Sequence, residues 1–292
     1  MQRKISLILS FCLIGILILS VNIGAEEYNE APILNKEVEK GNLPAVENRL
    51  PEEPLVVEPL NEIGQYGGNW RKVQNIFWWQ ATEPLVKLTP EGLKKIPNLA
   101  KDWEISKDYT KFTFHLREGV KWSDGNDFTA EDITFWYNDL ILNDDFTPGK
   151  PGWLKTKGEM AEVYAPDKYT IVFEFPAPKP LFIRSQAMGW RGAQMTRYPQ
   201  HYLKQFHPEY TEEEKIQARI EEAGVDSWIQ LMENRVNFQE NPDLPCLFPW
   251  DKATSPEKTL QIAERNPYYW KVDPEGNQLP YIDKMSWQNI EE

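Results

Sequence analysis

The stretch WEISKDYTKFTFHLREGVKWSDGNDFTAEDITFWYNDLIL, residues 103–142, decides the fold of this chain. Within it, Phe112, Phe114 and Leu116 alternate with polar residues, which is the period of two of a half-buried strand. Gly119 then breaks the pattern in a turn. The stretch therefore predicts a β-strand at its centre, closed by a turn.

A helix is predicted after this strand. Thr129 precedes an acidic residue, Asp132, by three positions, which is the arrangement of an N-cap with a capping carboxylate. Apolar residues then recur at i, i+3, i+4 and i+7, namely Ile133, Trp136, Tyr137 and Leu140. The spacing predicts a helix that buries an aromatic stripe, and with the strand it indicates a β-β-α unit of a mixed α/β domain.

The rest of the chain also alternates strand and helix signals. Residues 169–175 alternate in the period of a second strand. Thr211 is expected to cap a charged helix that Gly224 ends. Residues 268–272 and 279–287 are expected to form two strands joined by a turn.

The string itself resembles the signature of the bacterial oligopeptide and dipeptide solute-binding proteins, the extracytoplasmic receptors of ATP-driven importers. The resemblance rests on F-x-L-R-E-G-V-K-W-S-D-G at residues 114–125 and on F-T-A-E-D-I at residues 128–133. Two later stretches agree with it, PQHYLKQFHP at 199–208 and RNPYYWKVDPEGNQLPYID at 265–283. Together the matches span most of the chain after residue 60.

This resemblance implies an α/β, periplasmic-binding-protein-like fold with two lobes around a cleft. Residues 61–81 and 184–292 are expected to form an incomplete first lobe, and residues 82–183 a small inserted domain. Members of the resembled family are longer than this chain. The second lobe is therefore expected to follow residue 292, and the sequence is interpreted as a fragment.

Residues 1–25 have the layout of a secretory signal peptide. Two basic residues precede an apolar run over residues 5–21, and small residues follow up to Ala25. We expect export to the periplasm or cell surface with cleavage after Ala25, and an uncleaved membrane anchor is the alternative. Residues 26–60 are rich in Pro and Glu and are expected to form an N-terminal extension, with a short helix over residues 31–40, a short strand over residues 55–57 and extended chain elsewhere.

The charge and cysteine content limit the classes of function. The chain has 45 Asp and Glu residues against 32 Lys and Arg, a formal net charge of −13. An acidic exported chain without basic clusters is a poor candidate for binding nucleic acid or an anionic membrane surface. Cys246 is the only cysteine outside the apolar N-terminal run, so an internal disulfide is excluded and stability must come from the core.

Residues that could carry catalysis or bind a metal are sparse. The three histidines, His115, His201 and His207, lack any metal-binding spacing, so no metal is expected. Asp124 and Asp127 indicate turn chemistry rather than a calcium loop, and no G-x-S-x-G or phosphate-binding glycine loop occurs. We therefore predict no catalytic residues, no cofactor and no enzyme activity.

A binding function needs a cleft, a few polar groups and aromatic faces. The candidate ligand-binding residues are Trp78, Trp79, Trp190 and Tyr66. Trp78 and Trp79 are adjacent, so on a strand only one of them would face a cleft. Trp190 in M-G-W-R-G has the flexible glycine flanks of an exposed binding loop, and Tyr66 is similarly placed. The alternative for each is packing in the core or between lobes.

We therefore expect the solute-binding receptor subunit of an ABC importer, which captures short peptides or oligosaccharides for a membrane permease. A peptide would bind extended through its backbone, whereas a sugar would stack on tryptophan. The alternative from another class is an exported hydrolase that acts on peptides or glycosides. Because each lobe of a cleft receptor supplies contacts, residues 26–292 alone are expected to bind ligand more weakly than a two-lobed receptor.

Overall fold

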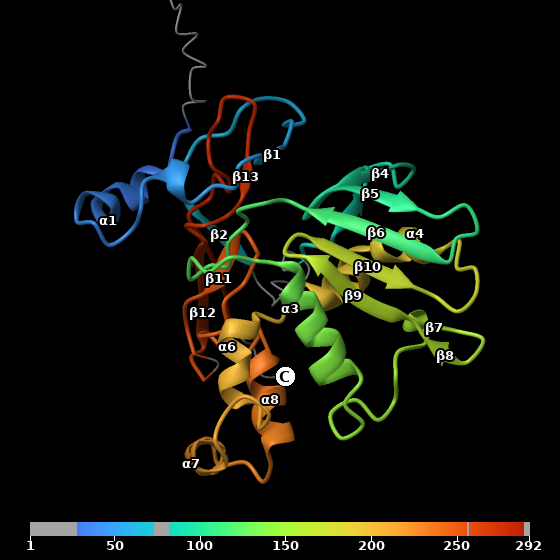
Figure 1. The fold of residues 1–292 in the computed structure, drawn as a ribbon. Helices are drawn as coiled ribbons and strands as arrows, with labels where there is room; N and C mark the ends of the chain where they lie inside the picture. The colour runs from blue at the N-terminus through green and yellow to red at the C-terminus, as the bar shows by residue number, and fades with distance from the viewer. Residues whose placement is uncertain (1–27, 73–81, 256, 289–292) are drawn as a thin grey trace, which may run out of the picture.

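The computed structural model describes residues 28–72, 82–255 and 257–288 (Figure 1). Within these ranges the chain forms two four-stranded sheets, three two-stranded ones and several short helices, so the expected α/β class is confirmed. The predicted signal peptide, Trp78 and Trp79 lie outside the described residues. None of the helices in the described ranges is both long and apolar enough to cross a membrane.

The strands in chain order are β1 (Leu55–Val56), β2 (Asn69–Lys72), β3 (Val86–Leu88), β4 (Lys95–Pro97), β5 (Ala100–Ile105), β6 (Lys111–Leu116), β7 (Lys155–Thr156), β8 (Glu159–Met160), β9 (Glu162–Asp167), β10 (Thr170–Glu174), β11 (Trp250–Lys252), β12 (Leu260–Arg265), β13 (Lys271–Val272) and β14 (Lys284–Gln288). The α-helices are α1 (Asn35–Glu39), α3 (Ala130–Phe135), α4 (Phe182–Gln186), α5 (Gly189–Gly192), α6 (Gln200–Leu203), α7 (Glu213–Ala223) and α8 (Trp228–Val236). A π-helix covers Trp136–Ile141, and 3-10 turns cover Pro32–Leu34, Val46–Asn48, Gly152–Leu154, Ala193–Met195 and Lys204–Phe206.

The first sheet has the strand order β5-β6-β10-β9 and is antiparallel throughout. Strand β6 confirms the predicted alternation, because Phe112, Phe114 and Leu116 are fully buried while the residues between them are partly exposed. Strand β10 lies within the predicted residues 169–175, but four consecutive residues of it are buried. Helix α3 contacts β9 and β10 from the side of the core that Phe173 enters.

Helix α3 begins where the sequence predicts. The Thr129 side chain accepts a hydrogen bond from the backbone N–H of Glu131 at 3.3 Å, and the Asp132 carboxylate accepts one from the Thr129 N–H at 2.8 Å. The helix continues as the π-helix, and its predicted stripe is buried throughout. Ile133 and Trp136 pack on the first sheet, whereas Leu140 packs in a second apolar cluster with α6, α7 and α8.

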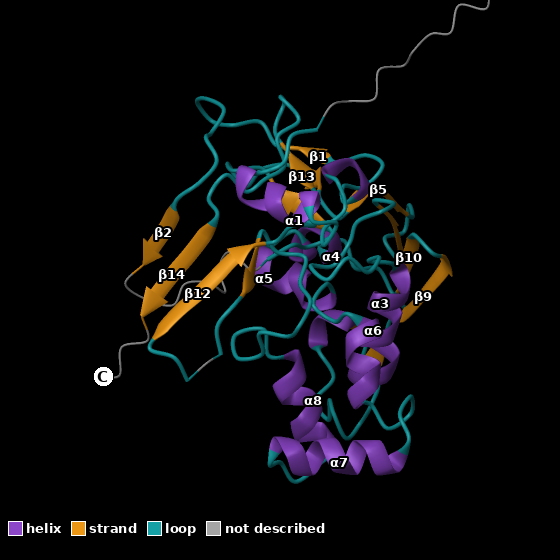
Figure 2. Cartoon of the chain, turned by 90° about the vertical axis from the view of Figure 1, so that its left-hand side faces the viewer, coloured by secondary structure: helices purple, strands orange, loops and turns teal. Residues whose placement is uncertain are grey.

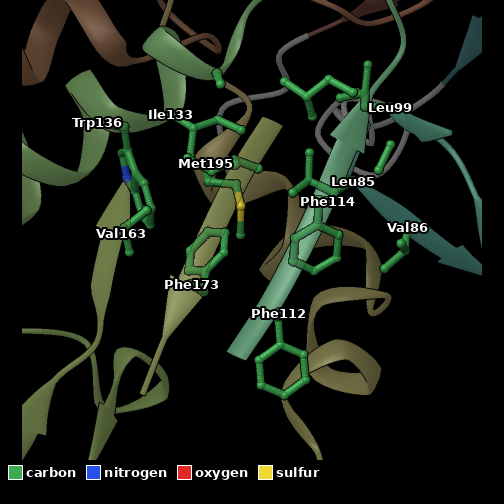
Figure 3. Packing of buried hydrophobic residues seen from close by; sticks show 14 of the residues in the cluster. Leu85, Val86, Leu99, Phe112, Phe114, Ile133, Trp136, Val163, Phe173 and Met195 are labelled. Atoms are coloured by element: carbon green, nitrogen blue, oxygen red, sulfur yellow. The ribbon is translucent and has the colours of Figure 1, made fainter. Parts of the chain in front are cut away.

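The main core lies between the first sheet and the helices α3 and α4 (Figure 3). Phe112, Phe114 and Phe173 project from neighbouring strands, and Ile133 and Trp136 close the core from the helix side (Figure 3). Each of these aromatic rings removes a large apolar area from water, and the burial of apolar area is the dominant favourable term in folding.

The second sheet has the order β11-β12-β14-β2 and joins distant parts of the chain. Strand β2 pairs in parallel with β14, with Trp70 opposite Met285. Figure 2 shows this sheet apart from β9 and β10, with helices between them in that view. The chain before residue 82 and the chain after residue 183 thus contribute strands to one sheet. This pairing is what we expect if the two segments form one lobe. The division into domains itself stays a prediction.

Some of the expected element bounds are wrong. Helix α7 begins at Glu213 rather than directly after Thr211, whose hydroxyl donates to the Lys204 carbonyl at 3.0 Å instead of capping. Gly224 ends it in the left-handed conformation, as predicted, with φ of 66°. The strand expected over 268–272 is confined to β13, because the Asn266 side chain binds the Tyr268 N–H at 2.8 Å in a turn.

Candidate ligand-binding site

Exposed apolar side chains lie at the start of α4, where Leu181 precedes the helix, and around α5, where Met188 precedes the helix that carries Trp190. Leu181 is 71% exposed, Met188 54% and Trp190 48%. Scattered single apolar residues are normal on a protein surface, but several large ones within one short segment make a candidate interaction site. We call Met188, Trp190 and Arg191 the α5 surface.

The side chains of the α5 surface combine an aromatic face with a cation. The guanidinium carbon of Arg191 lies 5.3 Å from the centroid of the Trp190 ring, within the range of a cation–π contact. Half of the Trp190 surface stays accessible to solvent. Such a pair offers a stacking surface for a sugar ring or apolar side chain, and planar donors for a hydroxyl or carboxylate.

Of the two glycines around Trp190, Gly192 serves close packing rather than loop flexibility. A Cβ at Gly192 would lie 1.7 Å from the Gln186 carbonyl oxygen and 2.7 Å from the Cβ of Pro84. A Cβ at Gly189 would lie 4.0 Å from Oγ1 of Thr82. Helix α5 therefore sits directly on residues 82–84, and only glycine permits this approach at position 192.

This packing brings residues 82–84 against the helix that carries the candidate Trp190. Residues 82–84 follow Trp78 and Trp79 closely in the chain, and they lie against the helix that carries Trp190. Trp78 and Trp79 themselves lie outside the described residues. Arg191 and Met188 were not singled out from the sequence, although the cation directly after an exposed tryptophan was an available signal.

Tyr66 belongs to a different set of contacts. Its hydroxyl donates to the Gln278 carbonyl at 2.9 Å, and the Asn29 carbonyl lies at 3.1 Å. Its ring lies edge-on to Tyr281 with centroids 6.0 Å apart, and the Arg265 guanidinium lies 5.3 Å from its centroid. Burial raises the pKa of the Tyr66 hydroxyl. These contacts join the N-terminal extension to the turn after β13.

The surface is also hollowed outside the α5 surface, at an apolar and at a polar place among others. The apolar hollow has a volume of about 360 Å³ and is lined by residues 249–250, Tyr269 and residues 279–282. The Trp250 indole N–H there donates to the Ile282 carbonyl at 2.9 Å, so the ring belongs to the fold. The polar hollow has a volume of about 280 Å³ and lies between α3 and α6.

The hydrogen bonds around the polar hollow do not form a catalytic arrangement of side chains. His201 Nε2 lies 2.7 Å from an oxygen of Asp124. Asp132 is occupied by two backbone N–H groups, those of Thr129 at 2.8 Å and Gln200 at 3.0 Å. Burial raises the pKa of Asp132 to about 6. Across the part of the chain that the structure describes, no group of three His, Cys, Asp or Glu side chains could hold a metal ion.

Comparison with known proteins agrees with this fold. The profile of the bacterial extracellular solute-binding proteins, family 5, middle region, matches residues 94–292. The periplasmic alpha-galactoside-binding protein of Rhizobium meliloti is 32% identical over 290 residues, which cover 90% of this chain and 39% of that protein.

Solved structures give the same result. An oligopeptide-binding protein OppA superposes with a TM-score of 0.84 at 46% identity, over 91% of this chain and 42% of that one. The periplasmic binding protein MelB of Agrobacterium fabrum, in complex with stachyose, superposes with a TM-score of 0.72 at 28% identity, over 90% of this chain and 41% of that one. The chain spans about two fifths of the length of these relatives. It belongs to the bacterial extracellular solute-binding proteins, family 5.

Proposed function

We propose that this chain supplies part of the ligand site of a solute-binding receptor for an ABC importer. The ligand class is a short peptide or an oligosaccharide. The observation that carries the proposal is the α5 surface, where the half-exposed Trp190 ring lies beside the Arg191 guanidinium. The names of relatives support both ligand classes, since one refers to alpha-galactosides, one structure contains stachyose, and another is named for oligopeptides.

The geometry explains how such a surface would bind either ligand. An indole face contributes apolar contact to a sugar ring or to a side chain of a peptide, at a low cost in conformational entropy. The Arg191 guanidinium carries donors in a fixed plane, which suit a carboxylate or a pair of hydroxyl groups. Each contact is reversible, and the proposal includes no covalent step.

The wider assignments follow from membership of the family. We propose that the protein is exported with cleavage after Ala25, that it delivers ligand to a membrane permease, and that it binds without turnover. Residues 61–81 and 184–292 would form part of one lobe and residues 82–183 a small domain attached to it. The second sheet supports this division, because β2 and β14 pair across the intervening segment.

The test is calorimetric titration of the intact protein with stachyose and, separately, with a pool of tri- to pentapeptides. Trp190→Ala should weaken binding of the cognate ligand by about 2 kcal/mol, roughly thirtyfold, as expected for a buried aromatic contact. Leu93→Ala is the matched control, because Leu93 is also a strongly exposed apolar residue but lies in the turn between β3 and β4. Unchanged affinity in Trp190→Ala would refute the proposed site.

A further inference from the structure

Glu83 is a buried carboxylate in the short segment that packs against α5. It is 2% exposed and stands between Thr82 and Pro84, the two residues next to Gly189 and Gly192. A carboxylate at such depth must be paired and hydrogen-bonded, because transfer of an isolated charge from water into the protein is costly. The groups that bind the Glu83 carboxylate therefore show what fixes residues 82–84 in position.

Four side chains surround the Glu83 carboxylate. Lys271 Nζ lies 2.8 and 3.0 Å from its two oxygens, and Lys87 Nζ lies 3.0 Å from one of them. The Tyr269 hydroxyl donates at 2.7 Å and the Asn98 amide at 2.9 Å. Burial by itself would raise the pKa of Glu83, but the two ammonium groups and the hydrogen bonds lower it to about 2. The carboxylate is thus ionised at neutral pH.

The backbone of the same segment is fixed as well. The buried Thr196 hydroxyl donates to the Glu83 carbonyl at 2.7 Å. The Asn98 amide donates to the Pro84 carbonyl at 2.6 Å. Residues 83–84 are therefore bound on one side by the chain that follows α5 and on the other by residues near β5 and β13.

Stability alone does not account for this cluster. Buried ion pairs are weak evidence for stability, because apolar residues of similar volume often replace them at no cost. The cluster instead holds residues 82–84 in one defined position. Gly192 packs so closely against this segment that a residue with a Cβ would not fit at position 192. A shift of this segment would move α5, and with it Trp190 and Arg191.

We infer that Glu83 is a positioning residue for the α5 surface, which it holds in place through Lys271 and Thr196. The inference rests on the proposed function only where it concerns ligand affinity. The orientation of Trp190 in the absence of ligand follows from the packing alone. The two parts can therefore be tested separately on the same variants.

The experiment uses the intact protein labelled with 5-fluorotryptophan, with the Trp190 resonance assigned from Trp190→Phe. The variant Glu83→Gln/Lys271→Met removes both charges of the main pair, so no unpaired buried charge from that pair is left behind. Thr196→Val is a milder second variant, which loses the hydroxyl contacts to the Glu83 carbonyl at 2.7 Å and to the Ala193 carbonyl at 3.3 Å. Asp132→Asn is the matched control, because Asp132 is also a buried carboxylate but caps α3.

The expected result is a shifted or broadened Trp190 resonance in the double variant and in Thr196→Val, with the wild-type resonance in Asp132→Asn. Ligand affinity measured on the same folded samples should fall at least tenfold in the double variant and stay unchanged in Asp132→Asn. An unchanged Trp190 resonance in both Glu83 cluster variants would overturn the inference. A shifted resonance with unchanged affinity would support the positioning role and contradict the proposed function.

Discussion

Phe182 gives the sharpest test of how α4 is held on the core. Its ring centroid lies 4.8 Å from those of Phe112 and Phe175 and 5.2 Å from that of Phe173. The preceding residue, Leu181, is 71% exposed. Two adjacent apolar residues of similar size thus lie in opposite environments, which makes them a matched pair for mutation.

The expected magnitudes follow from these environments. Phe182→Ala would cost about 3–5 kcal/mol, much of the total stability of an ordinary domain, so the milder Phe182→Leu is preferable. Phe182→Leu loses the ring contacts to three phenylalanines and leaves a small cavity, for an expected cost of about 1–3 kcal/mol. Leu181→Ala should change stability by less than about 0.5 kcal/mol.

Urea unfolding followed by far-UV circular dichroism measures both variants. For a slope of about 2 kcal/mol/M, Phe182→Leu should lower the midpoint by roughly 0.5–1.5 M without changing the slope. Leu181→Ala should unfold at the wild-type midpoint. If the two variants share one midpoint, the Phe182 ring is not at the centre of the core, and the account of how α4 is anchored is wrong.

Three further predictions concern local structure. Thr129→Ala should lower the free energy of unfolding by about 1 kcal/mol in the same assay, since it removes the cap of α3. Gly192→Ala should be strongly destabilising because of the 1.7 Å approach to the Gln186 carbonyl, whereas Gly149→Ala, with no atom within 4 Å of the added Cβ, should be neutral. Burial raises the pKa of Asp132 from 3.8 to about 6. The stability that the protonated Asp132 carboxyl contributes is therefore fully present below about pH 3.8 and is lost as the pH rises through 6. Wild type should therefore lose about 2–3 kcal/mol relative to Asp132→Asn between pH 4 and 7, and a pH-independent difference would contradict this.

Elements governed by neighbouring residues could be predicted from the sequence. The alternation in β6 and the cap at Thr129 are local signals, and both are confirmed. Thr211 failed as a cap because its hydroxyl is used by the Lys204 carbonyl seven residues away. The strand expected over 279–287 begins only at β14, since Arg265 binds the backbone carbonyls of Pro280 and Tyr281. Such contacts with distant side chains leave no periodic signal.

The candidate site shows the same limit. Trp190 could be singled out as an exposed aromatic residue, but its glycine neighbours were interpreted as a sign of flexibility. The structure shows that Gly192 packs against Pro84, more than a hundred residues earlier in the chain. The Glu83 cluster was missed because its main partner, Lys271, is separated by 188 residues. A buried ion pair of that separation cannot be recognised in one sequence.

The most direct test of the central claim is hydroxyl-radical footprinting of the intact protein with and without saturating stachyose or the peptide pool. Trypsin releases residues 185–191 as one peptide, which carries both Met188 and Trp190. Tyr109, which is similarly exposed at 46%, is released in a separate peptide and serves as the reference. If the ligand covers the α5 surface, the cognate ligand should lower oxidation of Trp190 and Met188 several-fold and leave that of Tyr109 unchanged. Saturable binding with unchanged oxidation of Trp190 would contradict the central claim.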